Sequence, residues 1–170
     1  MDTPLRSLPR LRALVTQMPP IAAGTLLALL GGLIVLISPF FTWDRIDIVD
    51  RLRPQYSVSG LYQTGFDGGD GWFCIALAAV VIAFALWLLL AGRGTLASIN
   101  LLIMGAAAAF LTVAEFLDLP RKSNDSGNVL VHHGASVGLY ILGVGALLVL
   151  AGGVTRILVG PRRSARSQTD

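Results

Sequence analysis

The chain has 170 residues, of which 54% are hydrophobic and only 14% are charged, and its formal net charge is +3. A soluble domain usually carries about 25% charged residues. The composition therefore argues against a soluble enzyme and against nucleic acid as a partner, and favours an integral membrane protein. Because Cys74 is the only cysteine, an internal disulfide and a Cys-x-x-Cys redox pair are both excluded. We expect no thiol oxidoreductase and no resident cofactor.

The first 20 residues alternate leucine with arginine, as in Leu5, Arg6, Leu8 and Arg10. This pattern predicts a basic amphipathic arm that lies on an anionic cytoplasmic membrane surface. A disordered basic arm is the alternative. The Pro19-Pro20 pair ends the arm and is typical of the start of a helix.

Four apolar stretches dominate the rest of the chain, at residues 21–43, 72–91, 95–116 and 135–159. Each is close to the ~20 residues with which a helix crosses a bilayer, and none has a charged residue near its centre. The first is too long for a signal peptide, so we expect it to be retained. The sequence predicts an all-α membrane protein, an antiparallel bundle of four transmembrane helices over residues 21–159. Phe40, Phe41 and Trp43 indicate an aromatic belt at the outer membrane surface.

Two loops, residues 44–71 and 117–134, lie at the same end of the predicted bundle. The first contains short β-prone runs, including Ile46, Ile48 and Val58, which predict a small, partly ordered cap or a hairpin. The centre of the second, residues 121–128, is polar, and we expect it to be mobile. The basic tail, residues 160–170, is predicted to be disordered.

Basic residues indicate the orientation. Eight arginines belong to the arm, the link between spans two and three, and the C-terminal side, whereas the two loops hold four arginines and one lysine. We therefore expect both termini in the cytoplasm and the protein in the cell membrane.

Small residues recur at helical spacing within the spans, which allows the close approach of helices in lipid. Gly24, Ala28 and Gly32 are four residues apart in the first span. The other predicted packing positions are Gly105, Ala109, Gly134 and Gly138. We expect them to pack the bundle internally, with a dimer interface as the alternative. Asn100 is predicted to form a hydrogen bond between helices.

One cluster of polar residues is a candidate for a metal site or a proton relay. Glu115 and Asp118 come at the end of the third span, and His132 and His133 come just before the fourth. At one membrane level, carboxylates and imidazoles could bind zinc or copper, or relay protons. The simpler interpretation is a hydrated interface in which Glu115 pairs with Arg121 or Lys122. Adjacent histidines on an extended chain also point in opposite directions.

Short motifs spread over most of the chain resemble a group of small four-span membrane proteins of unknown function from GC-rich bacteria. They are the aromatic end of span one at Pro39 to Trp43, Ser59-Gly60, Asp70-Gly71 and the glycine-rich fourth span. The topology is also similar to that of claudins, which have a larger first outer loop, and this loop contains Gly60-Leu61-Tyr62. Claudins carry a disulfide there. Since this loop has no cysteine, adhesion and paracellular sealing are not implied.

These features lead to one main functional expectation and two alternatives. We expect a non-enzymatic accessory or scaffold subunit that binds membrane lipids and another membrane protein, or a second copy of itself. A small oligomeric channel or transporter is the first alternative, and its polar lining would be Ser98, Asn100 and Thr112. An extracytoplasmic metal-handling protein that uses Glu115, His132 and His133 is the second.

Overall fold

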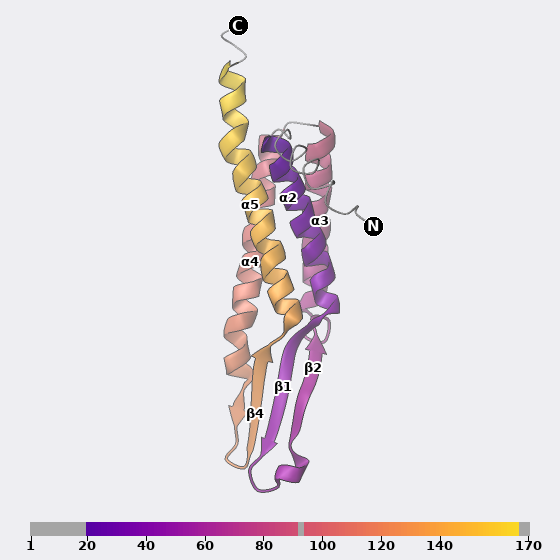
Figure 1. The fold of residues 1–170 in the computed structure, drawn as a ribbon, viewed down its shortest axis with the longest axis vertical. Helices are drawn as coiled ribbons and strands as arrows, with labels where there is room; N and C mark the ends of the chain where they lie inside the picture. Colours follow the sequence, from indigo (N-terminus) through magenta and orange to yellow (C-terminus); the bar gives the residue numbers. More distant parts are fainter. Residues whose placement is uncertain (1–19, 92–93, 167–170) are drawn as a thin grey trace, which may run out of the picture.

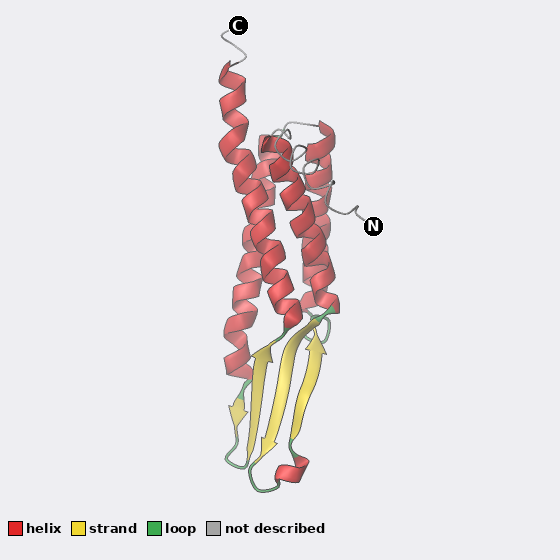
Figure 2. Ribbon diagram, viewed as in Figure 1, coloured by secondary structure: helices red, strands yellow, loops and turns green. Residues whose placement is uncertain are grey.

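The computed structural model describes residues 20–91 and 94–166. The predicted amphipathic arm lies outside the described residues, as do positions 92–93 and 167–170. Four long helices form one end of the molecule and a β-sheet forms the other (Figures 1 and 2). The sheet continues the long axis of the bundle and does not lie against its side.

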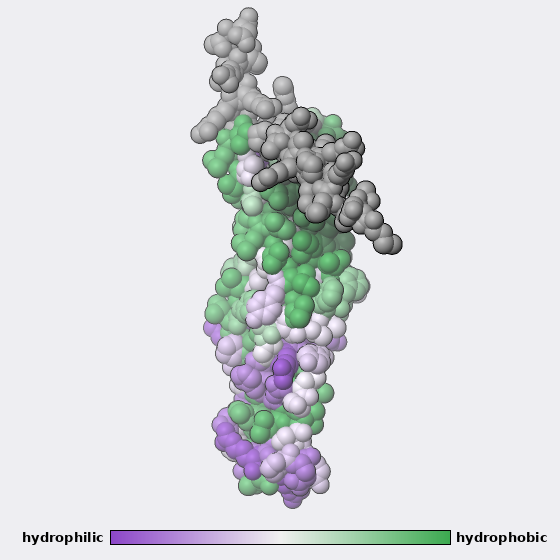
Figure 3. Space-filling model, in the orientation of Figure 1, coloured by the Kyte–Doolittle hydropathy of each residue, from purple (hydrophilic) through white to green (hydrophobic). Residues whose placement is uncertain are grey.

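The four helices are α2 (Pro20–Ile37), α3 (Asp70–Ala91), α4 (Thr95–Lys122) and α5 (Val137–Arg166). Each is long and apolar enough to cross a membrane, which confirms the prediction of four such helices. Figure 3 shows the matching surface, with apolar side chains over the helices and polar ones mainly over the sheet.

Three of the helices end at residues other than the predicted ones. α2 ends at Ile37 because Pro39 lies in a 3-10 turn, η1 (Ser38–Phe40). α4 continues six residues beyond position 116, to Lys122. α5 continues to Arg166, so residues 160–166, which were predicted to be disordered, are helical.

The helices form a closed ring. α2 packs between α3 and α5, and α4 contacts both α3 and α5. The buried core runs along the centre of this ring and includes Ala28, Val81, Leu101 and Leu142. Aliphatic side chains on the outer surfaces of the helices are exposed, as expected for helices surrounded by lipid.

The sheet corrects the all-α prediction. It has four antiparallel strands in the order β2-β1-β4-β3. The first loop supplies β1 (Thr42–Asp50) and β2 (Val58–Thr64), joined through the short 3-10 helix η2 (Pro54–Tyr56). The predicted hairpin is therefore present in this loop. The second loop, whose centre was expected to be mobile, supplies β3 (Asn124–Asp125) and β4 (Val129–Ala135). β4 pairs with β1 over seven residue pairs, from Asp44–Ala135 to Asp50–Val129, and so joins the two loops.

Trp43 fixes the sheet to the bundle. It was predicted to belong to an exposed aromatic belt, but it is only 6% exposed, whereas Phe40 and Phe41 are exposed. Its indole Nε1 donates a hydrogen bond of 2.9 Å to the carbonyl oxygen of Ser38, and its carbonyl oxygen accepts one from the backbone N–H of Ser136. A Cβ atom at Gly138 would lie 2.5 Å from the indole ring, so only glycine fits there. The junction is therefore tightly packed.

Candidate functional site

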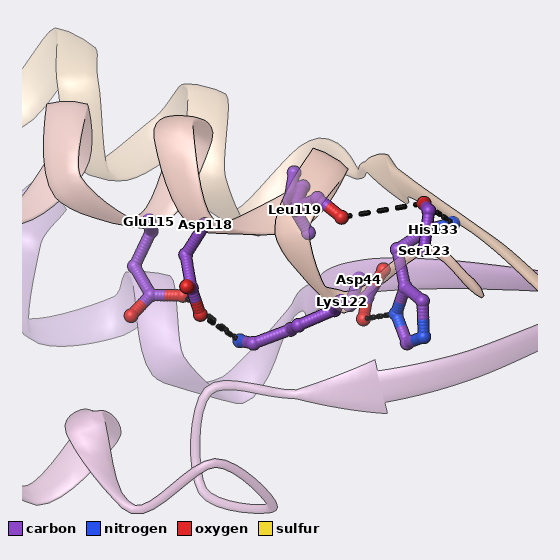
Figure 4. A network of polar contacts seen from close by, with 7 residues as sticks. All are labelled: Asp44, Glu115, Asp118, Leu119, Lys122, Ser123 and His133. Atoms are coloured by element: carbon purple, nitrogen blue, oxygen red, sulfur yellow. Dashed lines mark hydrogen bonds and ion pairs between the residues drawn. The ribbon is translucent and has the colours of Figure 1, made fainter.

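Three residues of the predicted polar cluster, Glu115, Asp118 and His133, lie where α4 meets the sheet (Figure 4). Glu115 and Asp118 share one side of α4 with Lys122. The ammonium nitrogen of Lys122 is 3.1 Å from an oxygen of Asp118 and 3.7 Å from an oxygen of Glu115. The interpretation in which Glu115 pairs with a basic residue at the interface is therefore confirmed for Lys122.

The two histidines lie on opposite faces of the sheet, as expected for neighbours on a strand. His133 pairs with Asp44 of β1, with 2.5 Å between Nδ1 and Oδ2. Both side chains are largely buried, and the pair connects the first loop to the second. His132 is exposed on the other face. Within residues 20–91 and 94–166, no three His, Cys, Asp or Glu side chains are grouped as ligands for a metal ion. The structure therefore does not bring the four predicted residues together.

Asp44 and Asp70 are the members of this site that the sequence analysis missed. Together with Glu115 and Lys122 they line a pocket of about 30 Å³ between β1, the start of α3 and the end of α4. Asp44 is a strand residue and Asp70 is the first residue of α3. The sequence did contain a signal. Asp44 directly follows the first apolar stretch and Asp70 lies two residues before the second, at the membrane level that was predicted for Glu115.

A second buried polar cluster lies toward the opposite end of the bundle. Arg156, one of the eight arginines that were counted for the cytoplasmic side, is only 6% exposed. Its guanidinium donates hydrogen bonds to Ser98 Oγ of α4, at 3.1 Å, and to Thr25 Oγ1 of α2. Among the described residues, Asn100 makes no hydrogen bond to another helix. The predicted interhelical bond is therefore made two residues earlier, by Ser98.

The small-residue positions mostly pack within the chain. A Cβ atom at Gly24 would meet α5, one at Gly32 would meet α3, and one at Gly105 would meet Leu150 of α5. Ala28 is fully buried and Ala109 packs against the core. Two positions differ from the prediction, because Gly134 belongs to β4 and Gly138 packs against Trp43.

The closest contact between helices also involves Gly31 and Gly152, which the prediction did not single out. A Cβ atom at Gly152 would lie 2.4 Å from the carbonyl oxygen of Gly24, and one at Gly31 would lie 2.6 Å from that of Gly145. The backbones of α2 and α5 are thus in direct contact, which supports internal packing over a dimer interface at these positions.

Two of the side chains that were predicted to line a channel make other contacts. The hydroxyl group of Ser98 donates a hydrogen bond to the backbone carbonyl of Gly94, just before α4, and that of Thr112 donates one to the carbonyl of Ala108. The outer surface of the bundle has an apolar groove of about 470 Å³ between α2 and α5. Neither feature provides a polar path along the described helices.

The sheet has one markedly apolar face. The register places Ile46 and Ile48 of β1 beside Leu61 and Val58 of β2 and beside Val131 of β4. Val58 and Leu61 are each 44% exposed. We call these five residues the apolar sheet face. Beyond the end of α4, Figure 2 shows none of the four long helices beside the sheet, and only the short helix η2 lies at its tip.

The tip of the sheet is held by polar contacts. Arg51 pairs with Asp125 at 2.9 Å, which connects the end of β1 to β3. Hydrogen bonds from the backbone N–H of Gly127 and from Arg51 hold the pKa of Asp125 below its usual value. In the turn before α3, hydrogen bonds from the backbone N–H and the hydroxyl group of Thr64 lower the pKa of Asp67 in the same way.

Comparison with known proteins adds no assignment. A scan against protein-family models finds no match to this sequence, and a search of curated proteins finds no similar protein. Function must therefore be argued from the polar junction and the apolar sheet face.

Proposed function

We propose that this protein is a non-enzymatic accessory or scaffold subunit of the cell membrane, which binds another membrane protein through its apolar sheet face outside the bilayer. The observation that carries this proposal is the exposure of Val58 and Leu61 beside Ile46, Ile48 and Val131, on the part of the sheet that extends beyond the end of α4. An exposed apolar patch with a polar surround is typical of a protein interaction site.

The attachment of the sheet favours binding of a partner over a merely structural role. Trp43 and Gly138 pack at its base, and the Asp44–His133 pair joins its two central strands. A surface held in this way loses little conformational entropy when it binds. The sheet is therefore a pre-organised platform at a fixed height above the membrane.

The polar residues at the far end of the sheet also fit a protein partner better than a lipid surface. Asp50 and Asp125 lie toward the end of the sheet that is far from the bundle, and Arg51 pairs with Asp125 there. Because Arg51 and Arg53 are balanced by Asp50 and Asp125, the tip has no excess of basic residues that would attract anionic headgroups. Lipid instead contacts the exposed aliphatic side chains of the four helices.

Two neighbouring residues of β2 provide the test. Leu61 belongs to the apolar sheet face, and Tyr62, which pairs with Arg45, lies on the opposite face. We expect Leu61→Asp to reduce recovery of a stoichiometric membrane partner at least about tenfold after gentle extraction from native membranes, because a charge would be buried at the contact. Tyr62→Asp is the matched control and should retain the partner.

The thermal midpoint of each purified variant separates loss of binding from loss of folding. Equal recovery with Leu61→Asp and wild type, or equal loss with both variants at wild-type stability, would contradict the proposal. A wild-type protein that is recovered alone after cross-linking in native membranes would contradict it as well.

A further inference from the structure

Three aromatic rings meet on the outside of the molecule at the base of the sheet. β2 runs back to the bundle, and a turn, residues 65–69, leads from it into α3 (Figure 1). Phe66 of this turn packs edge to face against Phe40 of η1 and against Trp72 of α3, with ring centroids 5.2 Å apart in both pairs. Phe40 is 65% exposed and Trp72 is 68% exposed. We call these three residues the aromatic cluster. So much exposed apolar surface in one place is typical of a binding surface.

The turn that carries Phe66 is held in one position. The carboxylate of Asp67 accepts hydrogen bonds from the backbone N–H and the hydroxyl group of Thr64, at 2.6 and 2.9 Å. The backbone N–H of Gly71 donates one of 2.8 Å to the carbonyl oxygen of Gly65. A Cβ atom at Gly65 would lie 2.7 Å from the indole ring of Trp43, so the turn packs directly on the base of the sheet. The aromatic cluster therefore loses little conformational entropy when it binds.

The aromatic cluster lies where the apolar surface of the bundle ends. Phe40 comes just after the end of α2, and Trp72 is in the first turn of α3. Both helices carry exposed apolar side chains up to this point, such as Ile37 in α2 and Phe73 in α3. Exposed acidic surface begins beside it, at Asp67. Tryptophan is enriched at such a boundary because its ring is apolar while its indole N–H can stay hydrated.

We propose that the aromatic cluster inserts into the headgroup region of a phospholipid bilayer, so that the turn before α3 is a membrane anchor. The continuity of the cluster with the exposed apolar surface of α2 and α3 favours the bilayer over a second protein as its partner. Phe66 belongs to the loop that was predicted to lie outside the membrane, and its ring contacts bring it to the helix ends. The anchor would set the height of the apolar sheet face above the bilayer. This inference does not depend on the proposed function.

The first test measures tryptophan fluorescence of the full chain in phosphatidylcholine nanodiscs. The lipid is brominated either close to the headgroup or at the middle of the acyl chain. Comparison of wild type with Trp72→Phe isolates the emission of Trp72, and Trp87→Phe does the same for Trp87, an exposed residue about 22 Å further along α3. We expect bromine near the headgroup to quench Trp72 at least about twofold more than bromine at mid-chain. Trp87 is the matched control and should lack this preference.

The second test asks whether the turn itself reaches the bilayer. In the Trp72→Phe background, Phe66→Trp places an indole in the turn, and Tyr56→Trp places one in η2, at the far tip of the sheet. Each change exchanges one aromatic ring for another at a site that is not fully buried, so folding should be kept. Headgroup bromine should quench the indole of Phe66→Trp and should leave that of Tyr56→Trp unchanged, whereas aqueous iodide should quench Tyr56→Trp.

The same measurements can overturn the proposal. Equal quenching of Phe66→Trp and Tyr56→Trp by brominated lipid would contradict it. So would an indole in Phe66→Trp that only iodide quenches, because the aromatic cluster would then lie in water, free for a protein partner. Stronger quenching of Trp72 by mid-chain bromine than by headgroup bromine would place the cluster inside the hydrocarbon core and would contradict an anchor in the headgroup region.

Discussion

The bundle and the sheet bury their apolar residues in different ways. In the bundle, glycines such as Gly31 and Gly152 bring helix backbones into contact, and the remaining aliphatic surface faces lipid. In the sheet, backbone pairing joins two loops far apart in sequence, and the apolar sheet face is left uncovered. A membrane accounts for the exposed apolar surface of the bundle but not for that of the sheet, which is why we assign binding to the sheet.

The largest expected effect concerns the close contact of α2 and α5. Gly152→Leu should destabilise the protein by about 3 kcal/mol, because its side chain would overlap the backbone at Gly24 and Ala28. Ala151→Leu, at the neighbouring exposed position, is the control and should have little effect. Unfolding in mixed micelles measures both. Similar stabilities of the two variants would show that this contact does not hold the bundle together.

The buried arginine should come next. Arg156→Met removes the charged donor to Ser98 and Thr25 and should cost about 2 kcal/mol, since hydrogen bonds to charged groups are worth about 1.5–3 kcal/mol. Ser98→Ala removes one of these bonds and should cost less. The same unfolding assay applies. A fully stable Arg156→Met variant would rule out a structural role for the cluster.

At the polar junction, the two histidines form a matched pair. His133→Ala leaves the buried Asp44 without its partner and should cost about 1–2 kcal/mol. His132→Ala, on the exposed face, should change stability by less than about 0.5 kcal/mol. Hydrogen exchange of the β1 and β4 amides should rise in His133→Ala alone. Equal exchange in both variants would argue against a role of the Asp44–His133 pair in joining the loops.

The smallest effect is expected at the tip of the sheet. Because the pKa of Asp125 is lowered in the folded protein, its contacts with Gly127 and Arg51 stabilise the tip at neutral pH. This contribution is lost as the pH falls through the lowered pKa, below the ordinary value of 3.8. After correction for the intrinsic exchange rate, protection of the Gly127 amide from hydrogen exchange should fall on acidification in the wild type and should not change in Asp125→Asn. An exchange rate independent of pH after correction for intrinsic exchange would refute it.

Apolar length was sufficient to predict the four helices, because a run of about 20 apolar residues has few other stable structures. The sheet was predicted only in part, because the pairing of Val129–Ala135 with Thr42–Asp50 joins segments about 85 residues apart. Local pattern carries no information about such a register. For the same reason Asp44 was missed as the partner of His133. The burial of Arg156 was not predicted, because it depends on hydroxyl groups from two other helices.

The most direct test of the account concerns the position of the sheet relative to the membrane. Ser126 lies in the exposed turn between β3 and β4, and Leu147 is exposed on the lipid-facing surface of α5. In a Cys74→Ala background, a membrane-impermeant maleimide should label Ser126→Cys in intact cells and should not label Leu147→Cys. Labelling of Ser126→Cys only after lysis would place the sheet in the cytoplasm and contradict the account.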